Sequence, residues 1–308
     1  MPGFRIDMIN VGQGDATIIA TEERTLLVDS GPLAEGTLVL NHIREHCGGE
    51  LDGVVLTHVD DDHIMGLLAV LDGGIRPGVV YFNDPRLFQD EALTERVEAL
   101  VQLHASVRSA LDLRDRLVES KIPIEPLLAG DRLNLGSDTL VTVLSPTEEL
   151  MRACVGRYRS YNQRNLSRQL VEAHERSSRV CSGENESSIV LEVECGEVRA
   201  LLPSDACARV LREVALRSYE FVKIPHHGSW HNTTPDLVQA WAQGGGRAAI
   251  SCGENTYRHP SAEVVDWFVS GGALVRCTRC HGTVSFGYMG AQSAFAGGPP
   301  AGNCQCGE

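Results

Sequence analysis

The sequence lacks the features that direct a chain into a membrane. Residues 1–7 show no basic segment followed by an apolar run, so they predict no secretory signal. No stretch approaches the ~18 uninterrupted apolar residues that a membrane-spanning helix needs. We therefore expect a soluble, cytoplasmic protein without a membrane partner, in which the ten cysteines are thiols or metal ligands rather than disulfides.

Positive charge is also scarce. The chain has 27 Lys and Arg residues against 41 Asp and Glu residues, and its formal net charge is −14. A chain with this balance does not adhere strongly to nucleic acid or to anionic membranes. A nucleic-acid substrate stays open, because bound divalent cations and a local basic segment can offset the charge at one site.

Two common catalytic motifs are missing as well. The sequence contains neither the G-x-S-x-G turn of serine hydrolases nor a P-loop. Gly12-Gln13-Gly14 is too short for a nucleotide-binding fingerprint. We interpret it as a tight turn at the rim of a site, with contact between its amides and a phosphate as the alternative.

The most informative segment is the octet 56–63, LTHVDDDH. It follows an apolar stretch that predicts a buried strand, and the apolar spacing of residues 64–70 after it is helical. The octet carries two histidines and two aspartates whose side-chain groups bind divalent cations: His58, Asp60, Asp62 and His63. An acidic helix N-terminus is the alternative interpretation, but it explains only the aspartates. We therefore predict a metal site.

Three other segments end a predicted strand in polar side chains. Asp29 follows the strand predicted at 25–28, and Asp205 follows the one predicted at 198–202. His226 and His227 follow the apolar segment 222–224. Since strand ends of a layered α/β fold converge on one edge, we expect these groups to meet the octet.

These motifs together resemble a known family. The segments 9–15 (INVGQGD) and 27–31 (LVDSG), with the octet, are similar to the opening of the metallo-β-lactamase fold, and more narrowly to the hydrolase domain of the ComEC competence proteins. Later segments agree in order: 185–191 (NESSIVL), 201–205 (LLPSD), 223–229 (KIPHHGS), 251–255 (SCGEN), 257–260 (YRHP) and 278–283 (TRCHGT). The resemblance covers residues 4–287 and implies an αββα metallo-β-lactamase-fold sandwich with helical inserts.

The resemblance assigns metal-binding roles. His58 and Asp60 would hold one metal ion, and Asp62 and His63 would hold a second. Asp205 would bridge the two ions. The expected catalytic residues are accordingly Asp62, His63 and Asp205.

Further roles follow from the same resemblance. One of His226 and His227 would be a ligand, and we favour His227 because Gly228 lets the backbone approach closely. His259 is another candidate ligand. Asp29 would orient the ligands from behind, as residues next to metal ligands commonly do.

One position departs from the family pattern. The family commonly has H-x-H-x-D-H, whereas here Asp60 replaces the middle histidine. A carboxylate oxygen suits manganese or magnesium better than an imidazole, which suits zinc. We therefore expect two divalent metal ions with manganese favoured and zinc or magnesium as alternatives. A lapsed site is the other interpretation of Asp60.

Two inserts interrupt the family pattern. Residues 89–120 carry a helical apolar stripe, which predicts a helix covering the core, or else a partner-binding surface. The insert 150–182 holds seven arginines against two glutamates between Met151 and Val180. Arginines among tyrosines fit phosphate contact and base stacking, with a solvated loop as the alternative. The expected substrate contacts are Ser229, Trp230, Arg157, Arg159 and Arg164.

The C-terminal cysteines are a separate question. Cys277 and Cys280 have zinc-ligand spacing, but Cys304 and Cys306 follow the Gly/Pro-rich stretch 296–302 at a spacing that is not standard. We expect free thiols there. The predicted organisation is a hydrolase domain at residues 1–290 followed by a flexible tail at 291–308.

The most consistent function is metal-dependent phosphodiester hydrolysis by a water activated between two metals. DNA is the leading substrate, because ComEC-like domains are implicated in DNA degradation. DNA transport does not carry over, since the sequence has no membrane channel segment. The alternatives are a small-molecule phosphodiesterase or esterase and a non-catalytic metal-binding interaction protein.

Overall fold

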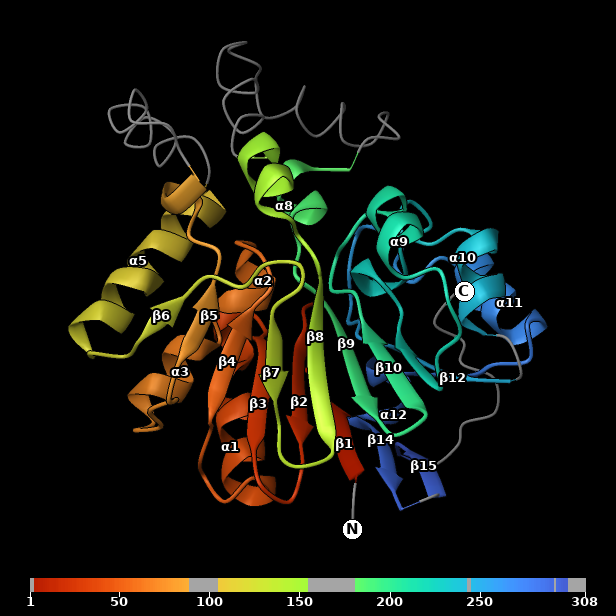
Figure 1. The fold of residues 1–308 in the computed structure, drawn as a ribbon, viewed down its shortest axis with the longest axis horizontal. Helices are drawn as coiled ribbons and strands as arrows, with labels where there is room; N and C mark the ends of the chain where they lie inside the picture. The colour runs from red at the N-terminus through yellow and green to blue at the C-terminus, as the bar shows by residue number, and fades with distance from the viewer. Residues whose placement is uncertain (1–2, 89–104, 155–180, 243–244, 291, 299–308) are drawn as a thin grey trace.

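The chain folds around two β-sheets that face each other. The computed structural model describes residues 3–88, 105–154, 181–242, 245–290 and 292–298 (Figure 1). Eight described strands form the first sheet, in the order β15 (Gln292–Ala296), β14 (Val284–Met289), β1 (Gly3–Met8), β2 (Ala16–Ala20), β3 (Thr25–Ser30), β4 (Gly53–Leu56), β5 (Val80–Phe82) and β6 (Ile124–Glu125).

The second sheet contains seven described strands. Their order is β13 (Leu274–Cys277), β12 (Arg247–Ile250), β11 (Phe221–Lys223), β10 (Val198–Leu202), β9 (Val190–Cys195), β8 (Thr139–Ser145) and β7 (Arg132–Asn134). Apolar side chains such as Phe4, Val193 and Phe221 fill the space between the sheets, and all three are fully buried. Burying a side chain of this size contributes about 1.5–3 kcal/mol, so this layer is a main source of stability.

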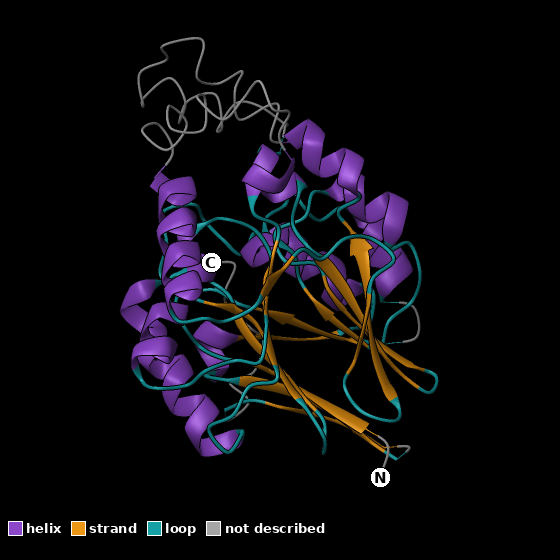
Figure 2. Cartoon of the chain, turned by 60° about the vertical axis from the view of Figure 1, so that its left-hand side comes forward, coloured by secondary structure: helices purple, strands orange, loops and turns teal. Residues whose placement is uncertain are grey.

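Helices cover the outer face of each sheet (Figure 2). The first sheet carries α1 (Gly36–His46), α3 (Leu67–Asp72) and α5 (Ala105–Glu119), and the second carries α9 (Ala208–Val214), α10 (Pro235–Trp241) and α11 (Ala262–Ser270). Short helical turns complete the described elements: η1 (Leu33–Glu35), α2 (Asp61–Ile64), η2 (Pro85–Phe88), α8 (Gly183–Glu186), η4 (His226–Gly228) and α12 (Thr278–His281). The predicted αββα sandwich is confirmed.

The parallel strands bring the polar strand ends together. β3 and β4 are parallel in the first sheet, and β10, β11 and β12 are parallel in the second. The two sheets are tied at this edge by the amide of Ile189, which donates to the carbonyl oxygen of Thr57 at 2.9 Å. The loops after all five strands therefore open into one region, as the sequence predicted.

The insert helix and the tail differ partly from expectation. Helix α5 confirms the helical stripe over residues 105–119, while the part of the insert at residues 89–104 lies outside the described residues. The predicted flexible tail begins too early, because residues 292–296 form β15 on the edge of the first sheet. Phe295 explains this strand, since its ring packs 6.1 Å from that of Phe221.

Among the described residues, no helix has both the length and the apolar character to cross a membrane.

The prediction that the cysteines form no disulfides was wrong for three described cysteines: Cys181, Cys207 and Cys277. Cys181 and Cys207 form a disulfide with a Cα–Cα distance of 6.0 Å. Cys277 is disulfide-bonded as well, which removes it from the suggested zinc site. The expectation depended on the compartment, and the sequence gives no sign that residues 26 positions apart lie side by side.

Candidate metal centre

The octet folds as predicted into a strand, a tight loop and a helical turn. β4 ends at Leu56, His58 follows in the loop, and α2 begins at Asp61. The amide of Asp15 donates to the carbonyl oxygen of Asp62 at 3.1 Å, so the Gly12–Gly14 turn holds this loop from the other side. Gly14 has to be glycine, because a Cβ there would collide with the same carbonyl oxygen. The loop is thus fixed at both ends.

Hydrogen bonds define the protonated nitrogen of two buried histidines. His63 Nδ1 lies 2.8 Å from Asp29 Oδ2, and His227 Nδ1 lies 2.9 Å from the carbonyl oxygen of Ser251. A carboxylate and a carbonyl oxygen only accept, so both Nδ1 atoms carry the hydrogen in these bonds. Nε2 of each neutral ring is then left with a free lone pair.

Hydrogen bonds define the protonated nitrogen of His58 as well. The Thr57 hydroxyl donates to Asp29 Oδ2 at 2.8 Å, so it accepts from His58 Nδ1 at 3.0 Å. Nε2 of all three histidines is buried and has no hydrogen-bond partner among the described residues. Buried polar atoms are nearly always paired in folded proteins, so three unpaired lone pairs in one place call for a ligand.

Carboxylates face these nitrogens. His63 Nε2 is 3.4 Å from Asp205 Oδ2, and His227 Nε2 is 3.4 Å from Asp62 Oδ2. His58 Nε2 lies 3.5 Å from Asp60 Oδ2. Three triplets of described residues have ligand atoms within 4.8 Å of one another: His58, His63 and Asp205; Asp62, His63 and His227; and Asp15, Asp29 and His63. The first two include the unpaired Nε2 atoms, whereas in the third both carboxylates lie on the Nδ1 side of His63. The donor set and the unpaired nitrogens fit a pair of adjacent divalent cations.

The two neighbouring histidines of the P-H-H-G-S segment have different surroundings. His227 is buried and belongs to the triplet with Asp62 and His63. His226 has a side chain that is 29% exposed, with Nδ1 2.9 Å from Asn232 Oδ1 and Nε2 3.6 Å from Asp205 Oδ2. His227, rather than His226, is therefore placed among the inward-facing groups.

His259 lies further from these triplets. Its ring is 5.5 Å from that of His226, and no described triplet includes it. Burial lowers the pKa of His259 to about 4, and the imidazole of His226 acts in the same direction. His259 is thus neutral at physiological pH and lies next to the outer histidine.

The backbone is strained at the centre. Four non-glycine residues there have a positive φ: Asp29 (56°), Ser204 (50°), His226 (47°) and His227 (53°). Each such residue costs on the order of 1–3 kcal/mol and concentrates at functional sites in folded proteins. Gly228 lies directly against Pro260, where a Cβ would not fit. The surrounding structure thus holds these four residues in strained conformations that orient their side chains at the centre.

The carboxylates and imidazoles at the centre shift one another's pKa values. Burial opposes protonation of His63, but the Asp205 and Asp29 carboxylates raise its pKa well above the ordinary value. Burial would raise the pKa of Asp205, yet the histidines around it, His226 first, hold that pKa well below the ordinary value. The cluster therefore attracts positive charge strongly.

Several residues at the centre were given no role in the sequence analysis. Lys223 and Asp15 form a buried ion pair behind the imidazoles. Asn232 donates to the carbonyl oxygen of Asp205 at 2.9 Å and accepts from His226. Burial raises the pKa of Glu184 on α8 to about 7, and the Asp60 carboxylate adds to the effect. Two signals were available for Lys223, which opens the motif 223–229 and is a lysine within an apolar strand.

The predicted substrate contacts divide into three groups. Trp230 is 50% exposed, and its ring lies 3.8 Å from that of His231. Ser229 is buried, and its Oγ accepts from the amide of His231 at 3.3 Å, so its contact with substrate stays a prediction. The predicted contacts in the arginine insert lie outside the described residues: Arg157, Arg159 and Arg164.

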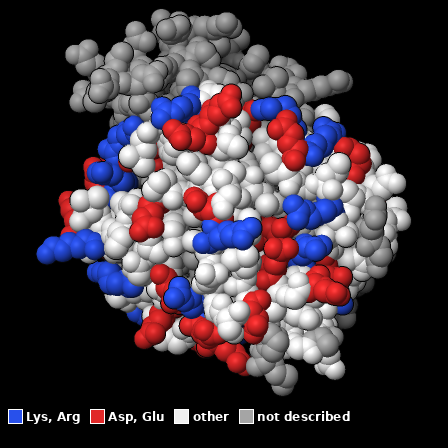
Figure 3. All heavy atoms as spheres, viewed as in Figure 1, with Lys and Arg blue, Asp and Glu red and all other residues white. Residues whose placement is uncertain are grey.

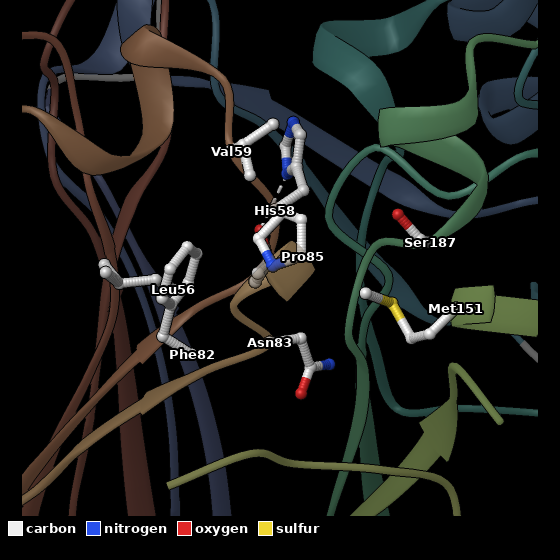
Figure 4. Close-up of a pocket in the computed structure, with 9 residues that line it drawn as sticks. Leu56, His58, Val59, Phe82, Asn83, Pro85, Met151 and Ser187 are labelled. Atoms are coloured by element: carbon white, nitrogen blue, oxygen red, sulfur yellow. Dashed lines mark hydrogen bonds between the residues drawn. The ribbon is translucent and has the colours of Figure 1, made fainter. Parts of the chain in front are cut away.

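A small cavity lies beside His58. Leu56, Phe82 and Pro85 line one side of it, and Met151 and Ser187 face them from the other (Figure 4). Acidic and basic side chains are interspersed on the face shown in Figure 3, without a large patch of one sign.

Comparison with known proteins agrees with this geometry. Residues 9–145 match the family model of the metallo-beta-lactamase superfamily, and the matched part contains the octet. This part of the chain is similar to a metallo-β-lactamase domain. It is 25% identical to ComE operon protein 3 of Bacillus subtilis (strain 168) over 319 aligned positions, which cover 96% of this chain and 34% of that protein. The chain thus spans about a third of the length of this relative.

A solved structure shares the fold. The crystal structure of the metallo-beta-lactamase fold protein YhfI from Bacillus subtilis matches with a TM-score of 0.51 and 11% identity, over 94% of this chain and 100% of that one. The metallo-β-lactamase fold implies divalent metal ions, and the described triplets are candidate sites for them. The chain accordingly has the metallo-β-lactamase fold, and its residues 9–145 are similar to that superfamily.

Proposed function

We propose that this chain is a cytoplasmic phosphodiesterase that uses two divalent metal ions to cleave nucleic acid, with DNA as the leading substrate. The observation that supports it best is the set of three buried Nε2 atoms, each without a hydrogen-bond partner in the described chain and each facing a carboxylate. The resemblance to the ComEC hydrolase domain favours DNA as the substrate.

The residues would divide into two subsites. His58 and Asp60 would hold one cation, while Asp62, His63 and His227 would hold the other. Asp205 lies between the two subsites and would contact both cations. When bound, such a pair supplies Lewis-acid activation of a water and neutralises charge on phosphoryl oxygens.

The protein's other groups keep this arrangement in place. Asp29 and the carbonyl oxygen of Ser251 hold the Nδ1 hydrogens of His63 and His227, so each Nε2 stays directed inward. His226 stays partly exposed and is fixed by Asn232, which places a polar ring where substrate would approach. Trp230 is exposed next to this segment and would stack on a base.

The carboxylate oxygens of the octet 56–63 affect which metal ion the centre would prefer. Asp60 contributes a hard carboxylate oxygen where many relatives have an imidazole. We therefore expect manganese to support activity better than zinc. Metal-depleted protein that regains full activity with zinc alone would contradict this part of the proposal.

The direct test is a cleavage assay. Purified, metal-depleted protein is incubated with single- and double-stranded DNA and RNA under manganese, magnesium or zinc. Two variants accompany it: Asp62→Ala/His63→Ala, which removes two ligands, and Asp61→Ala, which changes the exposed neighbour in the same loop. We expect manganese-dependent DNA cleavage that the first variant loses and the second keeps.

Other outcomes separate the alternatives. Bound metal without cleavage of any polymer would move the assignment to a small-molecule phosphodiesterase or esterase. Absence of bound metal would favour a non-catalytic interaction protein. Replacing the arginines of the insert, including Arg157, Arg159 and Arg164, should weaken DNA binding and reduce its salt dependence.

A further inference from the structure

One buried ion pair at the centre has no role in the proposed chemistry. Lys223 ends β11, three residues before His226, and Asp15 follows the glycine turn before β2. Their side chains contact each other, and both residues are fully buried. The chain has only two lysines among its 27 basic residues, and the other, Lys121, is exposed. A buried lysine is therefore exceptional in this protein.

Stability alone does not account for the pair. Removing two charges from water is costly, and apolar residues of similar volume usually stabilise a core at least as well as a buried ion pair. Burial opposes the charge on Lys223, but the carboxylates of Asp15 and Asp205 raise its pKa, so it stays protonated. The fold keeps one fixed positive charge directly behind the metal-binding groups.

Asp15 contacts one subsite specifically. Its Oδ1 lies 3.6 Å from His227 Nδ1, and its Oδ2 lies 3.8 Å from His63 Nδ1. Its backbone amide donates to the carbonyl oxygen of Asp62 at 3.1 Å. Asp15 thus lies behind all three members of the Asp62–His63–His227 triplet. No ion pair or hydrogen bond that the structure describes joins Asp15 to His58 or Asp60.

The charges around the centre balance when two divalent cations are present. Five aspartates supply or support the proposed subsites: Asp15, Asp29, Asp60, Asp62 and Asp205. Glu184 on α8 is left out of this sum, because burial raises its pKa to about 7 and keeps the carboxyl protonated below that pH. Lys223 offsets one of them, so four negative charges remain, which two divalent cations neutralise. Without Lys223, one buried carboxylate would be uncompensated in the loaded centre.

We infer that Asp15 and Lys223 are a positioning pair that holds the imidazoles of His63 and His227 in place and thereby sets the cation affinity of the Asp62–His63–His227 subsite. The inference rests on the proposed two-cation centre. Lys223 fixes the Asp15 carboxylate, and Asp15 in turn limits how far the two rings can rotate about their Nδ1 hydrogen bonds. The His58–Asp60 subsite does not depend on the pair.

The test replaces the pair by neutral residues of similar shape. Asp15→Asn/Lys223→Met removes both charges together, so no buried charge is left unpaired, and Lys121→Met is the matched control at the exposed lysine. Each full-length protein is metal-depleted and titrated with Mn²⁺ alone by calorimetry, and unfolding by urea is measured in parallel. Changing such a supporting contact typically costs 10–100-fold in metal affinity.

We expect the double variant to bind one Mn²⁺ as the wild type does and the other 10–100-fold more weakly, with Lys121→Met unchanged. Wild-type affinity for both ions in the folded double variant would overturn the inference and leave the pair a structural element. If the double variant does not fold, Asp15→Asn alone keeps the backbone contacts and is judged by the same two outcomes. Failure of the wild type to bind two ions would instead contradict the proposed centre itself.

Discussion

At the scale of single residues, a hydrogen bond at Nδ1 decides where each central histidine directs its lone pair. Asp29 is the most connected of the supporting residues. It accepts from the amide and the hydroxyl of Thr57 and from Nδ1 of His63, each at 2.8 Å. One carboxylate therefore orients His63 directly and His58 through Thr57.

Asp29→Asn tests this orienting role. Asparagine offers one acceptor oxygen in place of two, so at least one of the three bonds is lost. We expect metal affinity to fall about 10–100-fold and the free energy of unfolding to fall by about 1–3 kcal/mol. Calorimetric titration and urea unfolding measure the two effects, with Asp61→Asn as the control in the exposed part of the loop. Unchanged metal affinity in Asp29→Asn would rule the role out.

Glu184 gives a pH dependence with a definite sign. Its pKa is raised from 4.5 to about 7 in the folded, metal-free protein, first by burial and then by Asp60. The folded state therefore holds this proton more tightly than the unfolded state. The resulting stabilisation is fully present below pH 4.5 and is lost as pH rises through about 7.

Glu184→Gln should remove this pH dependence. Between pH 4.5 and about 8, metal-free wild type should lose roughly 2 kcal/mol more stability than the variant, after allowance for partial exposure of the side chain. Urea unfolding in the presence of a chelator at several pH values measures the difference. Parallel pH profiles for the two proteins would contradict the assignment.

At the scale of elements, the fold brings the loop after β3 against the turn between α2 and α3. Gly66 donates to the carbonyl oxygen of Gly31 at 2.8 Å, and a Cβ on Gly66 would collide with the carbonyl oxygen of Ser30. This contact fixes α2, and therefore His63, relative to Asp29. The glycine is needed for close approach rather than for an unusual backbone angle.

Gly66→Ala should separate these two segments. We expect a loss of about 3 kcal/mol in unfolding free energy, because the added methyl group meets backbone that cannot move aside. Gly287→Ala in β14 is the control, since a Cβ there meets nothing within 4 Å. Thermal and urea unfolding compare the two variants. Equal stability of both would show that the loops tolerate the shift.

At the scale of the whole molecule, the sequence predicted the sheets, the layers and the segments that meet at the centre. Polar residues directly after apolar strands carried that information, as in the octet and at Asp205. The contact between Lys223 and Asp15 was not predicted, although each lies in a quoted motif, because the two residues are 208 positions apart and either could have faced solvent. The Cys181–Cys207 disulfide and the strand around Phe295 depend in the same way on which distant segments become neighbours.

Cation binding should stabilise the whole molecule, because the ligands are assembled only in the folded state. At a free cation concentration of 100 times Kd, one site contributes about 2.7 kcal/mol. The number of sites is thus the quantity on which the account depends. Five carboxylates with a single buried lysine leave room for two divalent cations.

The most direct test is the stoichiometry of Mn²⁺ binding to metal-depleted protein, measured by calorimetry and by metal analysis after desalting. We predict two Mn²⁺ ions per chain for the wild type and for Asp61→Ala, and at most one for Asp62→Ala/His63→Ala. Folded wild-type protein that binds one ion or none would contradict the two-cation centre and the phosphodiesterase mechanism proposed from it.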